Sequence, residues 1–385
     1  MGASRRLRMT SVAALVVGVI PLGSPALATS PPVDDSGRTS VGATTPKPTR
    51  ITGFSATTER LPFGSVFRDS VRVRTGAGYV ARPVTLVGRR YDRSGWGPWS
   101  LLRRDRTSAD GRYAVSFSRS GAWQLRVEAP ATSAAEAATT ADKPVKLAEP
   151  GCRSRMSSVA HGVPYTTCTA KVNGIKVFYF VPKNTPLGSV RAAKIAFYFH
   201  GDGEPSYWQD STQFDYADQW TPMAWALHKG YVVAAPVAPK YGPGKQKWGA
   251  SHAFTNATGR ALRKFKRAVA ASGAMYWSTS GGSVYLARSY IPFVGHLMPG
   301  PMALSCGADV PAFGWRWSPA KNRKARNQLD LLFNHGSRDF LASYTRAART
   351  LYRAKGFDTK MRTWKGAGHC AHPIAGPTIN WFRSH

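Results

Sequence analysis

Between residues 150 and 385, short apolar runs alternate with longer segments in which apolar residues recur every three or four positions. The short runs are rich in aromatic and β-branched residues, as buried strands are, and the longer segments have helical spacing. Strands are expected at 175–182, 194–201, 231–239, 274–277, 296–307, 329–336 and 359–366, and helices at 217–230, 256–273, from 284 onward and at 342–356. Strand and helix in alternation predict a mostly parallel sheet with helices on both faces.

Residues 49–130 have a different pattern, in which short segments alternate apolar and polar residues and are separated by Gly, Asp and Ser. This period of two predicts a small all-β sandwich, and Asp110-Gly111 is a strong turn signal. The segment resembles the immunoglobulin-like or fibronectin-III-like accessory domains of secreted bacterial proteins. Its three tryptophans either fill the core or form a platform for stacking carbohydrate; they are Trp96, Trp99 and Trp123.

Two segments lack either pattern. Residues 29–48 are rich in Ser, Thr, Pro and Gly, which predicts a disordered N-terminal segment. Residues 131–149 are small and polar with no strand pattern, which predicts a linker. A second domain is therefore expected to occupy residues 150–385, a length sufficient for a full core.

The first 28 residues have the layout of a secretory signal. Three arginines within the first eight residues precede the apolar run at 11–22, and Ala26-Leu27-Ala28 supplies small residues for cleavage. We expect residues 1–28 to be removed and the product to be secreted, extracellular or associated with the cell wall. The paired arginines at 5 and 6 leave both the general and the twin-arginine export routes open.

Four cysteines are present, an even number that suits two disulfides in an oxidising compartment: Cys152, Cys168, Cys306 and Cys370. Their spacing matches no zinc motif, so no metal ligand set is expected. Cys152 and Cys168 are close enough in sequence to close a local loop, which would leave Cys306 and Cys370 to pair over a long range. The sequence alone leaves three pairings open.

The formal charge of +33 is spread over both halves of the chain. A field of this sign attracts polyanions, of which an anionic cell-wall polymer is the candidate partner. No nucleic-acid-binding module is recognisable, so nucleic acid is not an expected partner. After signal cleavage no apolar run approaches the length of a membrane span.

The run Ser278-Thr279-Ser280-Gly281-Gly282 lies between an expected strand and an expected helix. Small residues suit a sharp strand-to-helix turn, because such a turn is strained and brings the chain close to its neighbours. The pattern small-x-nucleophile-x-small places Ser280 at the nucleophile position, with Ser278 standing where a glycine is usual.

Together these features resemble the α/β-hydrolase family, over nearly all of residues 170–385. The resemblance implies that the catalytic acid follows a late strand, where Asp339 stands three residues after Gly336, with Asp309 as the substitute. It implies that the base follows the last strand, where His369 comes after a glycine-rich loop and His372 is the rival. The chain order Ser, Asp, His is the order that the fold requires.

The same resemblance assigns the oxyanion hole to two backbone N–H groups. One belongs to Gly281, directly after the nucleophile, and the other to Asp202, in the His-Gly loop after an early strand. His200 is expected to brace that loop rather than to act as a base.

Five aromatic residues are candidates for an acyl pocket: Tyr207, Trp208, Trp220, Trp315 and Trp317. Packing in the core or on the surface is the alternative for each. A small open site in a secreted enzyme with an accessory β-domain resembles the branch of the family that holds feruloyl esterases and polyhydroxyalkanoate depolymerases. A Cys306–Cys370 bond would tether the histidine loop near the nucleophile.

The resulting hypothesis is a secreted serine esterase that cleaves carboxylic esters, with polymer-attached esters among the candidate substrates. A serine peptidase or acyltransferase with the same triad is the first alternative, and an inactive cationic protein that binds cell-wall polymer is the second. No cofactor is expected, since the histidines are dispersed and no H-E-x-x-H motif occurs.

Overall fold

A computed structural model describes residues 45–61, 65–92, 94–148, 155–160, 163–182, 194–203, 221–239, 247–249 and 251–385. The expected signal peptide, most of the expected disordered segment and Cys152 lie outside these residues. Among the described residues, no helix combines the length and the apolar character needed to cross a membrane.

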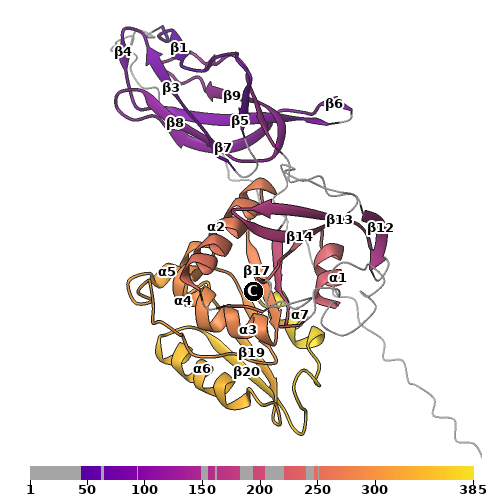
Figure 1. Ribbon diagram of the computed structural model, residues 1–385. Helices are drawn as coiled ribbons and strands as arrows, with labels where there is room; N and C mark the ends of the chain where they lie inside the picture. The colour runs from indigo at the N-terminus through magenta and orange to yellow at the C-terminus, as the bar shows by residue number, and fades with distance from the viewer. Residues whose placement is uncertain are drawn as a thin grey trace, which may run out of the picture. The chain divides into compact units, whose positions relative to one another are not determined.

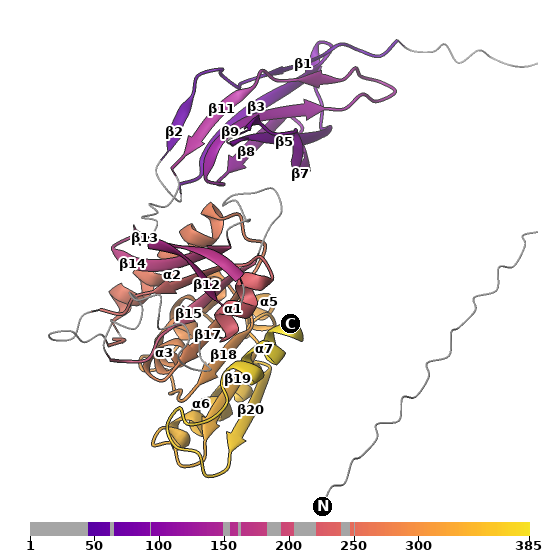
Figure 2. The same ribbon diagram turned by 90° about the vertical axis from the view of Figure 1, so that its right-hand side faces the viewer.

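The first part of the described chain consists of strands in two sheets (Figures 1 and 2). The smaller sheet has the order β1-β3-β4, with β8 paired to β3, and the larger has the order β2-β11-β9-β5-β6, with β10 and β7 at its sides. Their bounds are β1 Thr49–Thr52, β2 Glu59–Leu61, β3 Phe67–Thr75, β4 Gly78–Tyr79, β5 Pro83–Asp92, β6 Gly95–Trp96, β7 Ser100–Arg106, β8 Arg112–Phe117, β9 Gly121–Ala129, β10 Ala138–Thr139 and β11 Lys143–Leu147.

A shared core joins the two sheets. Alternate residues of β9 are buried, and Trp123 is fully enclosed with its ring edge-on to Phe117 at 5.1 Å. Trp123 is therefore a core residue. The hypothesis that all three tryptophans form a platform for stacking carbohydrate is wrong. Trp96 in contrast is 41% exposed.

The prediction of a linker at residues 131–149 is wrong for the second half of that segment. Residues 143–147 form β11, which pairs with β9 and β2, and Val145 and Leu147 join the core. The segment escaped prediction because its five residues include Pro144 and two lysines, so its period of two is carried by very few apolar side chains.

The second part of the chain contains a nine-stranded sheet in the order β12-β13-β14-β16-β15-β17-β18-β19-β20. The six strands β16-β15-β17-β18-β19-β20 are parallel to one another. Strand β14 is antiparallel to β16. The bounds are β12 Arg155–Ala160, β13 Val163–Val172, β14 Ile175–Pro182, β15 Ile195–Phe199, β16 Val232–Pro236, β17 Ala274–Thr279, β18 Met302–Ser305, β19 Leu331–Gly336 and β20 Thr359–Trp364.

Helices cover both faces of this sheet, as the alternation in the sequence predicts (Figure 1). One face carries α1 (Thr221–His228) and α7 (Ala375–Arg383). The other carries α2 (His252–Ala268), α3 (Gly281–Tyr285), the π-helical turn Leu286–Tyr290, α4 (Ile291–Val294) and α6 (Ala342–Ala354). Two short elements complete the set, a 3-10 turn at Gly295–Leu297 and α5 at Arg323–Arg326.

Strand β15 shows how the pleat divides the core in two. Ile195, Phe197 and Phe199 face the α2 side, and Ala196 and Tyr198 face the α1 side. Successive residues of a strand point to opposite faces, so a strand that is buried on both reads as a continuous apolar run. This run ends at His200, where the functional loops begin.

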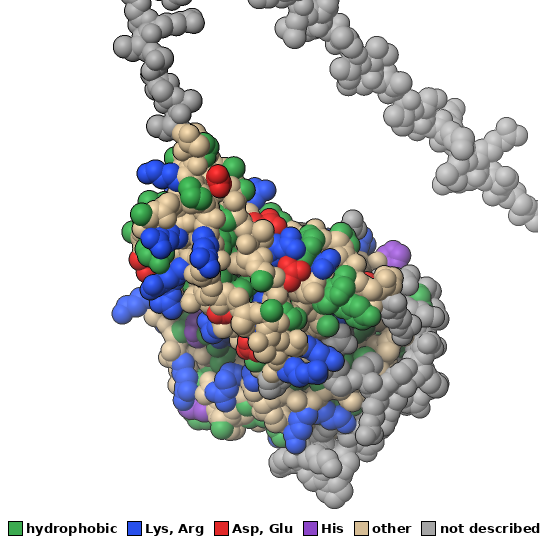
Figure 3. All heavy atoms as spheres, turned by 90° about the horizontal axis from the view of Figure 1, so that it is seen from above, with side chains coloured by type: hydrophobic (Ala, Val, Ile, Leu, Met, Phe, Trp, Pro, Cys, Tyr) green, Lys and Arg blue, Asp and Glu red, His purple; other side chains and the backbone are tan. Residues whose placement is uncertain are grey.

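Lys and Arg side chains are spread over the face of the molecule shown in Figure 3 and far outnumber acidic ones there. Basic side chains occur over much of this face, and several of them lie side by side. Such a distribution gives a general attraction to polyanions, without marking one binding site on the face shown.

Candidate active site

Ser280 lies at the sharp turn between β17 and α3. Its backbone has φ 47° and ψ −121°, a conformation that non-glycine residues rarely adopt and that costs on the order of 1–3 kcal/mol. The turn is held by the Ser280 N–H, which donates to the carbonyl of Ser305 at 2.9 Å. The Ser280 carbonyl in turn accepts from the N–H groups of Ser283 and Val284. Such strain persists only where the surroundings enforce it, and it is typical of functional positions.

The two glycines after Ser280 are required by close approach of the chain that follows β15. A Cβ on Gly282 would lie 2.3 Å from the carbonyl oxygen of Phe199, and one on Gly281 would lie 2.3 Å from the carboxyl carbon of Asp202. The backbone excludes any side chain at position 282, whereas a side chain at position 281 would have to displace the Asp202 carboxylate. This explains why the small residues in the sequence motif are glycines at these two places.

Ser278, where a glycine was expected, is fully buried and accommodated by hydrogen bonds. Its hydroxyl donates to the carbonyl of Ala303 at 3.2 Å and lies 2.9 Å from the hydroxyl of Ser283. Ser283 in turn accepts from the Ser305 N–H, so these serines tie α3 to β18. Ser278 and Ser283 are thus buried and bonded within the fold, whereas Ser280 is half-buried and is the one of these three serines whose hydroxyl faces a histidine.

Ser280, His369 and Asp339 form a hydrogen-bonded chain. Ser280 Oγ lies 2.8 Å from His369 Nε2, and His369 Nδ1 lies 2.9 Å from Asp339 Oδ1. The Asp339 side chain is fully buried and the His369 side chain is 27% exposed. This is the arrangement in which an imidazole takes the serine proton while a carboxylate holds the imidazole in the required tautomer.

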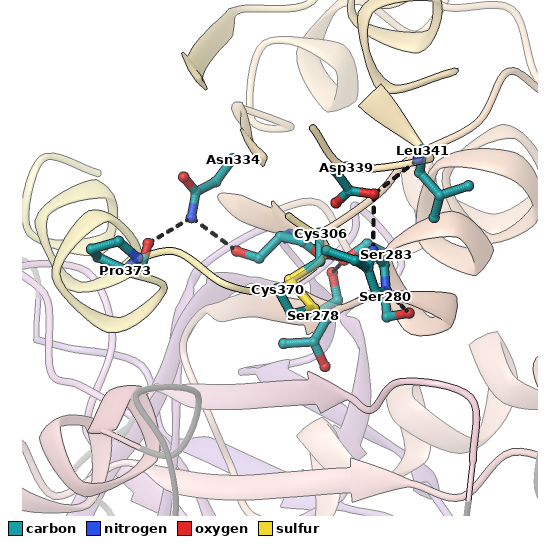
Figure 4. Close-up of a disulfide and its surroundings, with 12 residues drawn as sticks. Ser278, Ser280, Ser283, Cys306, Asn334, Asp339, Leu341, Cys370 and Pro373 are labelled. Atoms are coloured by element: carbon teal, nitrogen blue, oxygen red, sulfur yellow. Dashed lines mark hydrogen bonds and ion pairs between the residues drawn. A yellow bond between two sulfur atoms is a disulfide. The ribbon is translucent and has the colours of Figure 1, made fainter. Parts of the chain in front are cut away.

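Asp339 also shapes its own turn. Its Oδ1 accepts the Leu341 N–H at 2.8 Å, as Figure 4 shows, so one oxygen serves both the imidazole and the backbone. Oδ2 is buried, and no other group of the described residues hydrogen-bonds to it. The backbone hydrogen bond fixes the Asp339 carboxylate, and the fixed carboxylate orients the His369 ring.

The substitutes for acid and base lie elsewhere. Asp309 forms an ion pair with Arg288 at 3.1 Å and accepts its neighbour's backbone N–H. His372 is buried, and burial lowers its pKa, so it stays neutral. The structure brings His369, and not His372, to Ser280.

The loops that carry the acid and the base are joined to each other. The Arg338 N–H donates to the carbonyl of Ala367 at 2.9 Å, and a Cβ on Gly336 would lie 2.2 Å from the same oxygen. Asn334 adds a hydrogen bond to the carbonyl of Pro373 beyond the histidine (Figure 4). These contacts fix the distance between the end of β19 and the loop after β20.

A disulfide links Cys306, directly after β18, to Cys370, directly after His369 (Figure 4). The expected long-range pairing is therefore present. Since the Ser305 carbonyl accepts the Ser280 N–H, the disulfide connects the strand that holds Ser280 to the residue next to His369. Cys168 is also disulfide-bonded, and Cys152 lies outside the described residues.

The loop after β15 approaches Ser280 closely, since a Cβ on Gly201 would lie 3.3 Å from Ser280 Cβ. His200 braces this loop: its Nδ1–H donates to the carbonyl of Gly201 at 2.6 Å and its Nε2 accepts the Ala238 N–H at 3.1 Å. Both contacts require the neutral ring, and burial lowers its pKa to about 4. The bracing role expected from the sequence agrees with this geometry.

Trp248 is a second brace, which the sequence did not indicate. Its indole N–H donates to the carbonyl of His200 at 2.7 Å, and its backbone N–H donates to Asp202 Oδ1 at 2.9 Å. Burial raises the pKa of Asp202, and the Trp248 hydrogen bond opposes that rise. Trp248 therefore holds the Asp202 carboxylate and the His200 carbonyl, on either side of Gly201.

The expected aromatic pocket is corrected in part. Trp317 is buried and donates its indole N–H to the carbonyl of Ile291, and Trp315 stacks on Phe357 at 5.5 Å. Both rings belong to the core beneath α6, or pack against it. Tyr207, Trp208 and Trp220 lie outside the described residues.

One group of potential metal ligands occurs among the described residues. Carboxylate oxygens of Asp330 and Asp358 and a ring nitrogen of His385 lie within 4.8 Å of one another. Asp330 and Asp358 directly precede β19 and β20, whereas Asp339 and His369 follow the same strands. This group is therefore at the opposite end of the sheet from Ser280.

No protein-family model matches the chain, and no curated protein matches it by sequence. Solved structures resemble it weakly. Est1E from Butyrivibrio proteoclasticus is 11% identical with a TM-score of 0.37, over 57% of this chain and 96% of its own. A predicted CIB-like hydrolase from Thermoplasma acidophilum is 19% identical with a TM-score of 0.40, over 58% and 100%. A putative esterase from Staphylococcus aureus is 12% identical with a TM-score of 0.38, over 60% and 85%. These values are too low for activity or substrate to be transferred.

Proposed function

We propose that the chain is a serine hydrolase of the α/β-hydrolase type that cleaves carboxylic esters through Ser280, His369 and Asp339. The observation that carries the proposal is the continuous hydrogen-bonded chain from a strained, turn-borne serine hydroxyl to a buried carboxylate. The mixed sheet with helices on both faces and the chain order Ser, Asp, His support the same family.

The geometry suits a two-step reaction. Ser280 Oγ attacks the ester carbonyl as His369 Nε2 takes its proton, and the C–O bond to the alcohol breaks as His369 returns that proton to the alcohol oxygen. Water then attacks the acyl-enzyme by the same route, which releases the acid and restores Ser280. One ester and one water become one acid and one alcohol.

The negative charge that develops on the carbonyl oxygen needs fixed donors. We assign these to the backbone N–H groups of Gly281 and Asp202, because both lie at the turn and loop that meet beside Ser280. Loss of one such donor costs about 10²–10³ in kcat. His200 and Trp248 would act through Asp202, as positioning residues.

We further propose that the chain is exported and that residues 49–147 form an accessory domain of the immunoglobulin or fibronectin-III type. Disulfides indicate an oxidising compartment, and the net charge of +33 favours retention on an anionic cell-wall polymer. Export predicts that the secreted protein begins near Thr29, which N-terminal sequencing checks. Retention predicts adsorption to anionic polymer that salt reverses.

The test of the hydrolase is turnover of a panel of simple carboxylic esters by the purified protein and by Ser280→Ala. We expect turnover by the parent, with initial rates lowered by at least about 10⁴-fold in the variant. Turnover that survives in Ser280→Ala would remove Ser280 as nucleophile. An acyltransferase with the same triad would form a new ester when a second alcohol is added, with less free acid for each molecule of the first alcohol released.

If the parent turns over no ester but binds anionic polymer as tightly as Ser280→Ala does, the inactive binding protein becomes the better description. The high charge favours that second candidate. The hydrogen-bonded triad weighs against it, since an inactive scaffold has no need to keep a strained serine against an imidazole.

A further inference from the structure

Phe340 is the most exposed large apolar side chain of the described residues, with 70% of its surface accessible. It directly follows Asp339, and its ring rests on the imidazole of His369, with the ring centroids 4.5 Å apart and the planes at 38°. Core packing does not explain this position, because most of the ring faces solvent. An exposed aromatic ring against a candidate catalytic base is available to a ligand of that site.

The backbone holds Phe340 in place despite its exposure. The Leu341 N–H donates to Asp339 Oδ1, and the Ala342 N–H donates to the Asp339 carbonyl at 2.9 Å. Residues 339–342 therefore form a turn that is fixed on both sides of Phe340. The carboxylate that orients the imidazole also fixes this turn, so the phenyl ring is positioned before substrate arrives.

The position of the imidazole tells which part of an ester meets this ring. His369 Nε2 lies 2.8 Å from Ser280 Oγ and must hand its proton to the oxygen of the departing alcohol. The alcohol part of the substrate therefore lies on the imidazole side of the nucleophile. The carbonyl oxygen points instead toward Gly281 and the loop after β15, where the donors are.

We propose that Phe340 is a specificity residue that binds the alcohol part of the ester, and that the enzyme favours alcohols carrying an aromatic ring. This inference rests on the proposed esterase function. The phenyl ring of Phe340 has neither donor nor acceptor, so it selects by apolar and ring–ring contact. Ring pairs of this kind prefer offset or edge-on contact at centroid distances of 4.5–7 Å, which an exposed ring edge permits.

The experiment compares esters that differ only in where a ring is placed. Ethyl acetate and 2-phenylethyl acetate have alcohols of similar acidity, and ethyl 3-phenylpropanoate carries the ring on the acyl side. We expect kcat/KM of the parent to be about tenfold higher for 2-phenylethyl acetate than for ethyl acetate. Phe340→Ala should reduce this ratio to within about twofold and leave the ethyl 3-phenylpropanoate to ethyl acetate ratio unchanged. Phe340→Tyr, which keeps the ring, should retain the preference.

Phe313→Ala is the matched control. Phe313 is 60% exposed, but its ring packs against His252 and Phe293. The variant removes a phenyl of comparable exposure and should leave both ratios as in the parent.

Four outcomes would overturn the inference. An equal loss for all three esters in Phe340→Ala would show that the ring only shields or positions His369. A change confined to the acyl series would place Phe340 on the other side of the substrate. Turnover of every ester without preference would remove the specificity role but leave the hydrolase intact, whereas no turnover by the parent would overturn both.

Discussion

The two ends of the nine-stranded sheet differ in kind. At the carboxyl ends of β17, β18, β19 and β20 lie buried polar side chains and three non-glycine residues with positive φ: Ser280, Cys306 and Cys370. At the amino ends of β19 and β20 lie partly or fully exposed charges, Asp330 and Asp358, joined by His385. The same strands thus end in strained, interlocked loops on one side and in ordinary charged turns on the other.

This difference shows which end of the sheet contains features that lower the stability of the folded state. Strained backbone and buried carboxylate cost free energy, and they persist only where surrounding contacts enforce them. At the carboxyl end, the disulfide, the Asn334 hydrogen bonds and the loop-to-loop contacts provide that enforcement. The amino end needs none of them, which is the pattern expected if chemistry is confined to one edge.

The largest effect should come from the acid. Asp339→Asn should lower kcat for ester hydrolysis by about 10⁴-fold, because an amide stabilises the wrong imidazole tautomer. Asp309→Asn, which removes a carboxylate paired with Arg288, should change kcat by less than twofold. Steady-state rates of the two variants compare them directly; the reverse ranking would make Asp309 the acid.

Removal of the disulfide is expected to rank second. Cys306→Ser combined with Cys370→Ser should lower kcat by about 10–100-fold, since a displacement of the base by about 1 Å can cost 10²-fold. Cys168→Ser also loses a disulfide and should lower the melting temperature while leaving kcat close to that of the parent. Equal kcat in the two proteins would reduce the Cys306–Cys370 bond to a stabilising role.

Trp248→Phe tests the brace on the oxyanion loop. The variant keeps an aromatic ring, smaller than the indole, but loses the donor to the His200 carbonyl, so we expect kcat to fall about tenfold with KM unchanged. Trp317→Phe removes a comparable buried indole donor in the core and serves as the control. A matching loss of kcat in both variants would point to general loosening of the domain.

Acid should destabilise the carboxyl end of the sheet through its buried histidines. Burial lowers the pKa of His200 to about 4 and lowers that of His372, so the unfolded chain binds more protons below about pH 6.5. Stability is therefore lost as pH falls from about 6.5 to 4, by roughly 3 kcal/mol from His200 at most. Asp202 opposes this trend, because its pKa is raised.

Melting temperatures measured at pH 7.5, 5.5 and 4.5 check this expectation. The decline should be shallower in His200→Gln, which keeps hydrogen-bonding atoms but does not titrate. An identical pH slope in the parent and the variant would exclude His200 as a source of the acid sensitivity.

The smallest effect is expected at the amino end. Asp330→Asn and Asp358→Asn should change kcat by less than twofold, since both residues precede the strands whose far ends carry the triad. Assays of the two single variants suffice. A loss of kcat comparable to that of Trp248→Phe would contradict the claim that only the carboxyl end of the sheet contributes to catalysis.

The local pattern of apolar and polar residues predicted most strands and helices of this molecule. It failed where contacts between distant segments determine the secondary structure. The runs at 194–201 and 329–336 read as strands because they are apolar throughout, and the small residues around Ser280 read as a strained turn. The strand at 143–147 was missed because two apolar residues carry too weak a period. Helix α2 starts at His252, four residues before the expected Asn256, because Ser251 caps it by accepting from Phe254.

The site shows the same division. The spacing of Ser280, Asp339 and His369 is visible in the sequence because each follows a strand, and parallel strands bring their ends to one edge. Trp248 and Phe340 are not visible in this way. Trp248 contributes through hydrogen bonds to a loop 46 residues earlier, and Phe340 is distinguished only by the surface it leaves exposed.

The most direct measurement is covalent labelling of the folded protein with a fluorophosphonate, followed by mass spectrometry of the labelled peptide. The probe reports an activated serine without any choice of ester. We predict stoichiometric labelling at Ser280 that His369→Ala abolishes and His372→Ala preserves. Absence of label on the folded parent protein, or label at another serine that persists in Ser280→Ala, would contradict the triad proposed here.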